Sequence, residues 1–165
     1  MHATAALGLV IAAVVVSSMV AAASLDLSIK QLPARRRIGA LAYSDFSLMA
    51  NARTGLFWYV PLPFAWVVTA TAAAVVGWGD HPNEQRALAL AAVVVGVTAH
   101  LLVTGEFAAP TLLSQGRAAG DQRALDRIFD RFERWHTVRV FVDVATLAAA
   151  VWALTATLAG PTWRA

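Results

Sequence analysis

The sequence predicts an all-α integral membrane protein, a four-helix bundle with amphipathic helical connections on one side. Of its 165 residues, 59% are hydrophobic and 14% are charged, whereas a soluble domain has about 45–50% apolar and about 25% charged residues. The apolar residues gather in four blocks, at residues 5–23, 56–78, 87–105 and 140–158. Each block has the length of about 20 residues that a helix needs to cross a bilayer. The length favours one domain, residues 1–165.

The first block, residues 5–23, contains no charged side chain and predicts the first span. Small residues from Val20 to Ser24 would also suit a signal peptidase. However, residues 1–4 contain no Lys or Arg, and the apolar run is longer than the roughly 7–15 residues of a signal-peptide core. We expect a retained span, with cleavage as the alternative.

Aromatic residues mark both ends of the second block, residues 56–78. Phe57, Trp58 and Tyr59 lie at its start and Trp78 closes it. The 20 residues from Trp58 to Trp78 span roughly 30 Å of helix at about 1.5 Å per residue. This distance matches the hydrocarbon thickness, and aromatic side chains are typical of both interfaces.

The third and fourth blocks each contain one titratable side chain. This is His100 in residues 87–105 and Asp143 in residues 140–158. Buried helices of a soluble all-α protein are the alternative to membrane spans. Such helices carry a polar stripe that faces water, and residues 9–16 have none. The membrane interpretation is therefore favoured.

The basic residues predict the orientation. The long connections, residues 24–55 and 106–138, hold ten Lys and Arg, against two in the short connection and the tails. The positive-inside rule then places the long connections in the cytoplasm and both termini outside, and we expect a bacterial inner membrane. The run from Arg35 to Arg37 would lie near anionic headgroups. Nucleic acid is disfavoured as a partner because acids balance the Arg residues of the second long connection.

Both long connections are expected to be helical. Pro33 would open a helix running toward Asn51. In the other connection, apolar residues recur at helical spacing from Leu125 to Phe132, opposite an Asp/Arg-rich face. A single helix from about Asp121 to Leu158, a helix lying on the bilayer, and a helix packed on the first connection are the alternatives.

The polar residues inside the apolar blocks indicate function. His136, Arg139 and Asp143 share one face of the fourth helix. Arg139 and Asp143 are four residues apart and can pair, which would lower the cost of a charged Asp143 in the membrane. An intramembrane carboxylate marks a functional site or, as the alternative, a structural ion pair. His100 lies on a small-residue face that should pack inward, either as a core histidine or as part of the site.

In an antiparallel bundle these residues meet at one membrane boundary. We expect His100, His136, Arg139 and Asp143 to form the catalytic group, where an acid/base pair is favoured over a metal with His and carboxylate ligands. Four further residues are expected to line a substrate pocket: Tyr43, Asn51, Glu106 and Trp135. No metal-ligand motif is present, and no cofactor is evident from the sequence.

The order of helices and the segment Arg134-Trp135-His136-Thr137-Val138-Arg139 before the last helix resemble the anthrone-oxygenase-like family. Its members are small bacterial and fungal membrane proteins with four helices. The resemblance implicates Trp135, His136 and Arg139 in the terminal motif. It also implies a reaction, since some fungal members are associated with oxidation of anthrones to anthraquinones.

Three functions from different classes follow as hypotheses. The first is a membrane oxidoreductase or oxygenase that acts on an apolar aromatic or quinone-like small molecule. The alternative is a non-catalytic membrane module that packs with a partner protein or with itself as a homo-oligomer. A proton-coupled transporter ranks last, because the first two predicted helices contain no mid-membrane charge.

Overall fold

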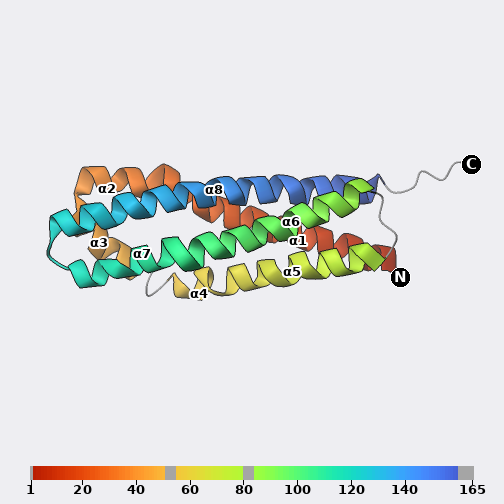
Figure 1. Cartoon of the computed structure of the whole chain (residues 1–165), viewed down its shortest axis with the longest axis horizontal. Coiled ribbons are helices and arrows are strands. Elements are labelled where there is room, and N and C mark those ends of the chain that lie inside the picture. Colours follow the sequence, from red (N-terminus) through yellow and green to blue (C-terminus); the bar gives the residue numbers. More distant parts are fainter. Residues whose placement is uncertain (1, 51–54, 80–83, 160–165) are drawn as a thin grey trace, which may run out of the picture.

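The computed structural model describes residues 2–50, 55–79 and 84–159, and its regular elements there are all helices. The described part of the chain has four long helical rods. They lie side by side, and the first rod begins at the end of the bundle where the fourth rod ends (Figure 1). Successive rods run antiparallel (Figure 1). The described part of the chain is therefore an up-down-up-down helical bundle.

The first rod is longer than the predicted span. α1 (His2–Asp26) passes through a π-helical turn (Leu27–Gln31) directly into α2 (Leu32–Ile38). Pro33 lies in the first turn of α2, where its missing N–H is tolerated. The chain turns at Gly39, whose φ of 83° suits glycine, and α3 (Ala40–Ser47) follows. The prediction that one helix runs from Pro33 toward Asn51 is wrong because Gly39 interrupts it; Asn51 itself lies outside the described residues.

The second and third rods differ in length. The second contains the short α4 (Leu56–Tyr59) and α5 (Pro61–Gly79). The third begins with α6 (Glu84–Leu102) and continues through a π-helical turn (Val103–Ala108), α7 (Ala109–Leu113) and a 3₁₀ turn (Ser114–Ala118). The third rod thus extends beyond the start of the second rod, where α4 lies (Figure 1).

The fourth rod is one continuous helix, α8 (Gln122–Leu158), of 37 residues. The Asp121 side chain caps its start by accepting a hydrogen bond from the backbone N–H of Ala124 at 3.0 Å. At about 1.5 Å per residue the helix is roughly 55 Å long, nearly twice the hydrocarbon thickness. Its N-terminal half therefore projects beyond any membrane that its apolar half crosses.

Within the described residues, four helices are long and apolar enough to cross a membrane: Thr4–Ile38, Pro61–Trp78, Glu84–Ala118 and Gln122–Leu158. Large apolar side chains point outward along them, including Val15, Phe64, Val95 and Phe141. Helices of this length and composition suggest a membrane protein.

Small residues let the four rods approach closely. α1 packs on α5 and α8, and α6 packs on the same two helices. Ala73, Ala89 and Ala153 are buried at one end of the bundle. At the contact between α6 and α8, a side-chain carbon on Gly96 would overlap the hydroxyl of Thr146. Close packing of this kind is typical of helices in membranes.

The connections form a helical lobe on the N-terminal half of α8. Ala40 and Tyr43 of α3 pack against Leu125 and Phe129. Three alternatives were expected for the second long connection. Two of them are found together: α8 is one continuous helix, and its N-terminal half packs on the first connection. Arg35 of the basic run does not face outward as expected, because it is buried and its Nη2 lies 2.6 Å from Asp130 Oδ1.

Candidate functional site

A buried polar cluster joins α1, α6 and α8 just inside the lobe. At its centre Asp143 is fully buried. Oδ1 of Asp143 lies 2.7 Å from Nδ1 of His100, and Oδ2 of Asp143 accepts a hydrogen bond from the Ser24 hydroxyl at 2.6 Å. Because a carboxylate only accepts, Nδ1 of His100 carries the proton in this pair. The carboxylate therefore fixes the tautomer of His100.

The ring of His100 is held on its other sides as well. The indole of Trp66 meets it edge-on, with centroids 5.1 Å apart and planes at 74°. Trp66 is itself fixed, since its Nε1 donates to Ser17 Oγ at 2.7 Å. Nε2 of His100 lies 3.4 Å from Thr104 Oγ1. His100 thus presents an unprotonated Nε2 next to a hydroxyl.

His136 is bonded on both ring nitrogens. Its Nε2 lies 3.0 Å from the backbone oxygen of Ser24, and its Nδ1 lies 2.7 Å from Nη2 of Arg139. A carbonyl only accepts and a guanidinium only donates, so Nε2 carries the proton and Nδ1 accepts. Phe132 stacks on the ring at 5.5 Å and 17°. These partners define a neutral His136.

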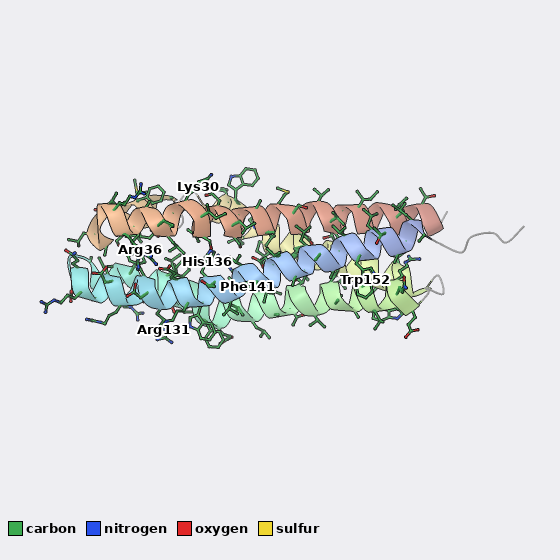
Figure 2. The ribbon with its side chains drawn as sticks, turned by 90° about the horizontal axis from the view of Figure 1, so that it is seen from above. Lys30, Arg36, Arg131, His136, Phe141 and Trp152 are labelled. Carbon is green, nitrogen blue, oxygen red and sulfur yellow. The ribbon has the colours of Figure 1, made fainter. Side chains whose placement is uncertain are left out.

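Ser24 connects the two histidines. Its hydroxyl bonds Asp143 and its carbonyl bonds His136. The cluster therefore runs from Arg139 through His136, Ser24 and Asp143 to His100. The predicted catalytic group does come together, although Asp143 contacts residues of two other helices, which spacing along α8 cannot reveal. Figure 2 places His136 between the first rod and α8, and Arg131 on the outer side of α8.

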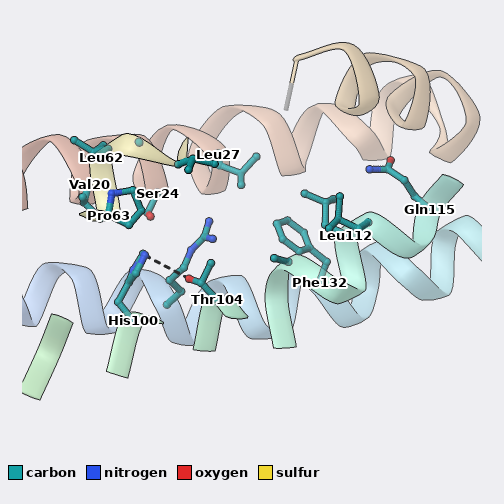
Figure 3. A pocket seen from close by; sticks show the side chains of 15 residues that line it. Val20, Ser24, Leu27, Leu62, Pro63, His100, Thr104, Leu112, Gln115 and Phe132 are labelled. Atoms are coloured by element: carbon teal, nitrogen blue, oxygen red, sulfur yellow. Dashed lines mark hydrogen bonds between the residues drawn. The ribbon is translucent and has the colours of Figure 1, made fainter. Parts of the chain in front are cut away.

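A cavity of about 330 Å³ lies beside this cluster. Its size is at the lower end of the range typical of small-molecule sites. Most of its wall is apolar, and the polar side chains that reach it are Ser24, His100, Thr104, Gln115 and Arg139. Figure 3 shows His100 and Thr104 toward one end, Leu112 and Phe132 farther along, and Gln115 at the other end. The cavity is thus an elongated apolar space with polar ends.

Gln115 is fixed at its end of the cavity. Its Oε1 accepts from Ser44 Oγ at 3.2 Å and its Nε2 donates to Ser47 Oγ at 3.3 Å. Both serines belong to α3. The first connection therefore helps to close the cavity, although through residues other than those expected from the sequence.

Three residues expected in the pocket do not line this cavity. Tyr43 packs in the lobe, edge-on to Phe129 at 5.0 Å. Trp135 stacks on Phe107 at 4.1 Å. Glu106 is exposed and lines an open groove between α7 and α8 instead. Asn51 lies outside the described residues. Of the four expected catalytic residues, His100 and Arg139 line the cavity. His136 and Asp143 do not line it; His136 is bonded to Arg139, and Asp143 is bonded to His100.

The main residues that sequence reasoning did not assign to the site are Ser24 and Gln115. A weak signal existed for Ser24, since Ser17 and Ser24 are seven residues apart and both are buried on one face of α1. Gln115 carried no signal, because its α7–α8 connection has no clear apolar period. Within the three described ranges, no group of three or more His, Asp or Glu residues is placed to share a metal ion.

The described site is therefore a buried Asp143–His100 pair and a His136–Arg139 pair, joined by Ser24 beside an apolar cavity. No protein-family model, no curated protein and no solved structure matches this chain.

Proposed function

We propose that this chain is a membrane oxidoreductase that oxidises an apolar aromatic substrate of the anthrone type with dioxygen. His100 serves as the base. The observation that supports this proposal is the position of His100, which lines an apolar cavity while its Nδ1 is bonded to buried Asp143. A histidine backed by a carboxylate is a common general base.

The reaction begins with a proton transfer. The methylene carbon of an anthrone lies between two aromatic rings, opposite a carbonyl group in the same ring, so its C–H bond is acidic. Nε2 of His100 takes this proton, and Asp143 stabilises the imidazolium that forms. The Ser24 hydroxyl keeps Asp143 in place. General-base catalysis of this kind contributes about 10²–10⁴-fold in rate.

Dioxygen is the oxidant in the proposed reaction and accepts the electrons of the carbanion. The carbanion transfers electrons to dioxygen, a C–O bond forms, and the peroxide takes up the proton held by His100. Loss of water from this peroxide leaves the second carbonyl group. In total, one CH₂ group and one O₂ give one C=O group and one H₂O. The apolar cavity contributes by excluding water from the carbanion.

The proposed enzyme lies in a bacterial inner membrane with its helical lobe in the cytoplasm. Exposed basic side chains at the lobe end support this orientation, among them Lys30, Arg36 and Arg37. Phe57 and Trp58, which are strongly exposed at the start of the second rod, suit the interface on the same side. The cavity then lies near the cytoplasmic boundary of the membrane.

The test measures anthrone oxidation by the full chain in lipid nanodiscs. Oxygen uptake and anthraquinone absorbance are followed, and the rate with empty nanodiscs is subtracted because anthrones oxidise slowly in air. We expect His100→Gln and Asp143→Asn to lower kcat at least 100-fold. Glu106→Gln, a change at an exposed carboxylate outside the cavity, should retain the wild-type rate. Full turnover by His100→Gln would contradict the proposal.

A further inference from the structure

Gln115 places a buried amide at the end of the cavity opposite His100 (Figure 3). Only 1% of the residue is exposed. Its Oε1 accepts from the Ser44 hydroxyl at 3.2 Å, and its Nε2 donates to Ser47 Oγ at 3.3 Å. Both serines lie on α3 and hold the amide in one orientation. A fixed polar group therefore stands at a mostly apolar wall.

One hydrogen of this amide is left for a molecule in the cavity. The NH₂ group of a glutamine has two N–H donors, and the bond to Ser47 uses one of them. Among the described residues, none accepts from the second N–H of Gln115. A buried donor without an acceptor costs free energy. An oxygen atom of a bound molecule would supply that acceptor.

The cavity is longer than a three-ring substrate. Gln115 follows His100 by 15 residues along the third rod, which corresponds to roughly 22 Å at about 1.5 Å per residue. Three fused rings next to His100 would leave the Gln115 end unfilled. The volume of about 330 Å³ is small for this length, so the remaining passage suits a single aliphatic chain.

The wall between the two ends is apolar. Leu27, Leu112 and Phe132 lie between His100 and Gln115 in Figure 3. They belong to the first, third and fourth rods and offer no hydrogen-bonding side chain. A methylene chain is favoured in such a passage, because its apolar surface is then removed from water.

We propose that the cavity binds an elongated substrate, with an aromatic or quinone ring at His100 and an aliphatic chain that carries a neutral oxygen acceptor at Gln115. The second N–H of Gln115 donates to that oxygen. Gln115 is then a specificity residue for the length of the chain and for its oxygen, and Ser44 is a positioning residue. This inference rests on the proposed substrate cavity but not on turnover, so binding can test it separately.

The binding experiment compares decylubiquinone with idebenone, two benzoquinones that have the same ring and the same decyl chain. Idebenone differs only by a hydroxyl group at the end of the chain. Both are titrated into nanodiscs that contain the full chain, with empty nanodiscs as the blank. Each variant is compared with the wild type in the same lipid, so the different partition of the two probes into the bilayer cancels.

Gln115→Met removes the donor and keeps a side chain of similar length. We expect it to lower the affinity for idebenone about three- to tenfold, as the loss of a neutral hydrogen bond would give, and to change the affinity for decylubiquinone less than twofold. The hydroxypentyl analogue of idebenone ends before Gln115, so its affinity should be the same in the variant and the wild type.

Two further variants separate positioning from general stability. Ser44→Ala frees the amide oxygen of Gln115, so it should weaken idebenone binding less than Gln115→Met does and leave decylubiquinone binding unchanged. A merely structural role of Ser44 would affect both probes alike. Gln122→Met, at an exposed position of α8 outside the cavity, is the matched control and should change neither affinity.

A photolabel locates the end of the chain in the wild-type protein, so a variant that fails to fold does not prevent the test. The probe is the decyl quinone with a diazirine at the chain end, and mass spectrometry identifies the labelled peptides. We expect labels in α3 and in residues 112–118. Labels confined to α1, α5 or lipid would overturn the inference.

Other results would also overturn it, namely binding of neither quinone, or an unchanged affinity of Gln115→Met for idebenone. Binding and turnover can fail independently. Gln115-dependent binding without anthrone turnover would retain this site and reject the proposed reaction. Anthrone turnover with quinone binding that does not depend on Gln115 would do the reverse.

Discussion

Nδ1 of His100 lies 2.7 Å from Oδ1 of Asp143, although 43 residues separate them in the chain. The contact joins α6 to α8, and Ser24 adds α1 through its bond to Oδ2. Three helices therefore contribute to one buried hydrogen-bond cluster. In a buried site of low dielectric, such contacts hold their members in one arrangement, because an unpaired polar group there would be costly.

The first prediction concerns Ser24. Ser24→Ala removes the donor to Asp143 Oδ2 and leaves a buried carboxylate oxygen without that bond. We expect a loss of about 1–3 kcal/mol in the free energy of unfolding, and a turnover rate three- to tenfold lower because Asp143 can shift. Thermal unfolding in detergent and the anthrone assay measure both effects.

Ser18→Ala is the control for this change. Ser18 is exposed on the same helix and its hydroxyl bonds the Val14 carbonyl within the helix. Neither stability nor rate should change beyond error. Equal effects of the two substitutions would show that the Ser24 hydroxyl does not support Asp143.

The second prediction concerns the route into the cavity. Val60 and Leu113 line the cavity although 47% and 64% of their surfaces are exposed, so they mark its opening between the start of α5 and α7. Leu113→Trp should narrow this opening. We expect a several-fold higher KM for the anthrone substrate with kcat nearly unchanged. Val68→Trp, at an exposed position of α5 that does not line the cavity, is the control. A lower kcat with an unchanged KM would contradict this route.

Much of the fold could be predicted from the sequence, for physical reasons. Apolar blocks of spanning length have few other stable arrangements, which is why residues 5–23, 87–105 and 140–158 fall within helices and residues 56–78 are helical except for the turn at Val60. The shared face of His136, Arg139 and Asp143 follows from helical periodicity alone. The rod lengths could not be predicted, because Leu27–Gln31 and Val103–Ala108 form π-helical turns that carry the helices onward without a break.

The cavity lining was harder to predict than the polar cluster. Tyr43 and Trp135 were expected to line the pocket. Instead, Tyr43 packs against Phe129, and Trp135 stacks on Phe107. Periodicity gives the face of a helix but not the rotation of its neighbour. Gln115 and Leu112 therefore reach the cavity from a connection whose local pattern gave no sign of it.

The third prediction concerns the contact between Gly96 and Thr146. Gly96→Ala would place a methyl group on the Thr146 hydroxyl and force α6 and α8 apart. We expect a loss of about 1–3 kcal/mol, as is typical of overpacking. Thr146→Ala in the same chain removes Oγ1 and Cγ2 and leaves Cβ, which would lie 2.9 Å from the added carbon, so the double variant should recover part of the stability. Unfolding of the purified protein in mixed detergent micelles measures this. Additive losses in the double variant would show that the two positions do not clash.

The last prediction concerns the ion pairs of the lobe. Arg35 is buried between Phe129, whose ring centroid is 5.8 Å from its Cζ, and the carboxylates of Asp130 and Glu133. Arg35→Met keeps most of the side-chain volume but leaves these carboxylates without their buried cation. Because Asp130 is 63% exposed, water compensates in part, and we expect a loss of about 1–2 kcal/mol.

Arg35 and its partners Phe129, Asp130 and Glu133 do not line the cavity, so Arg35→Met should slow anthrone turnover less than twofold at a temperature where the lobe is folded. Arg37→Met, at an exposed position of the same basic run, should change neither stability nor rate. Hydrogen exchange would locate the effect: we expect faster exchange in α2 and α3 and unchanged exchange in α5. Faster exchange throughout the bundle would instead show that the lobe and the membrane helices unfold as one unit.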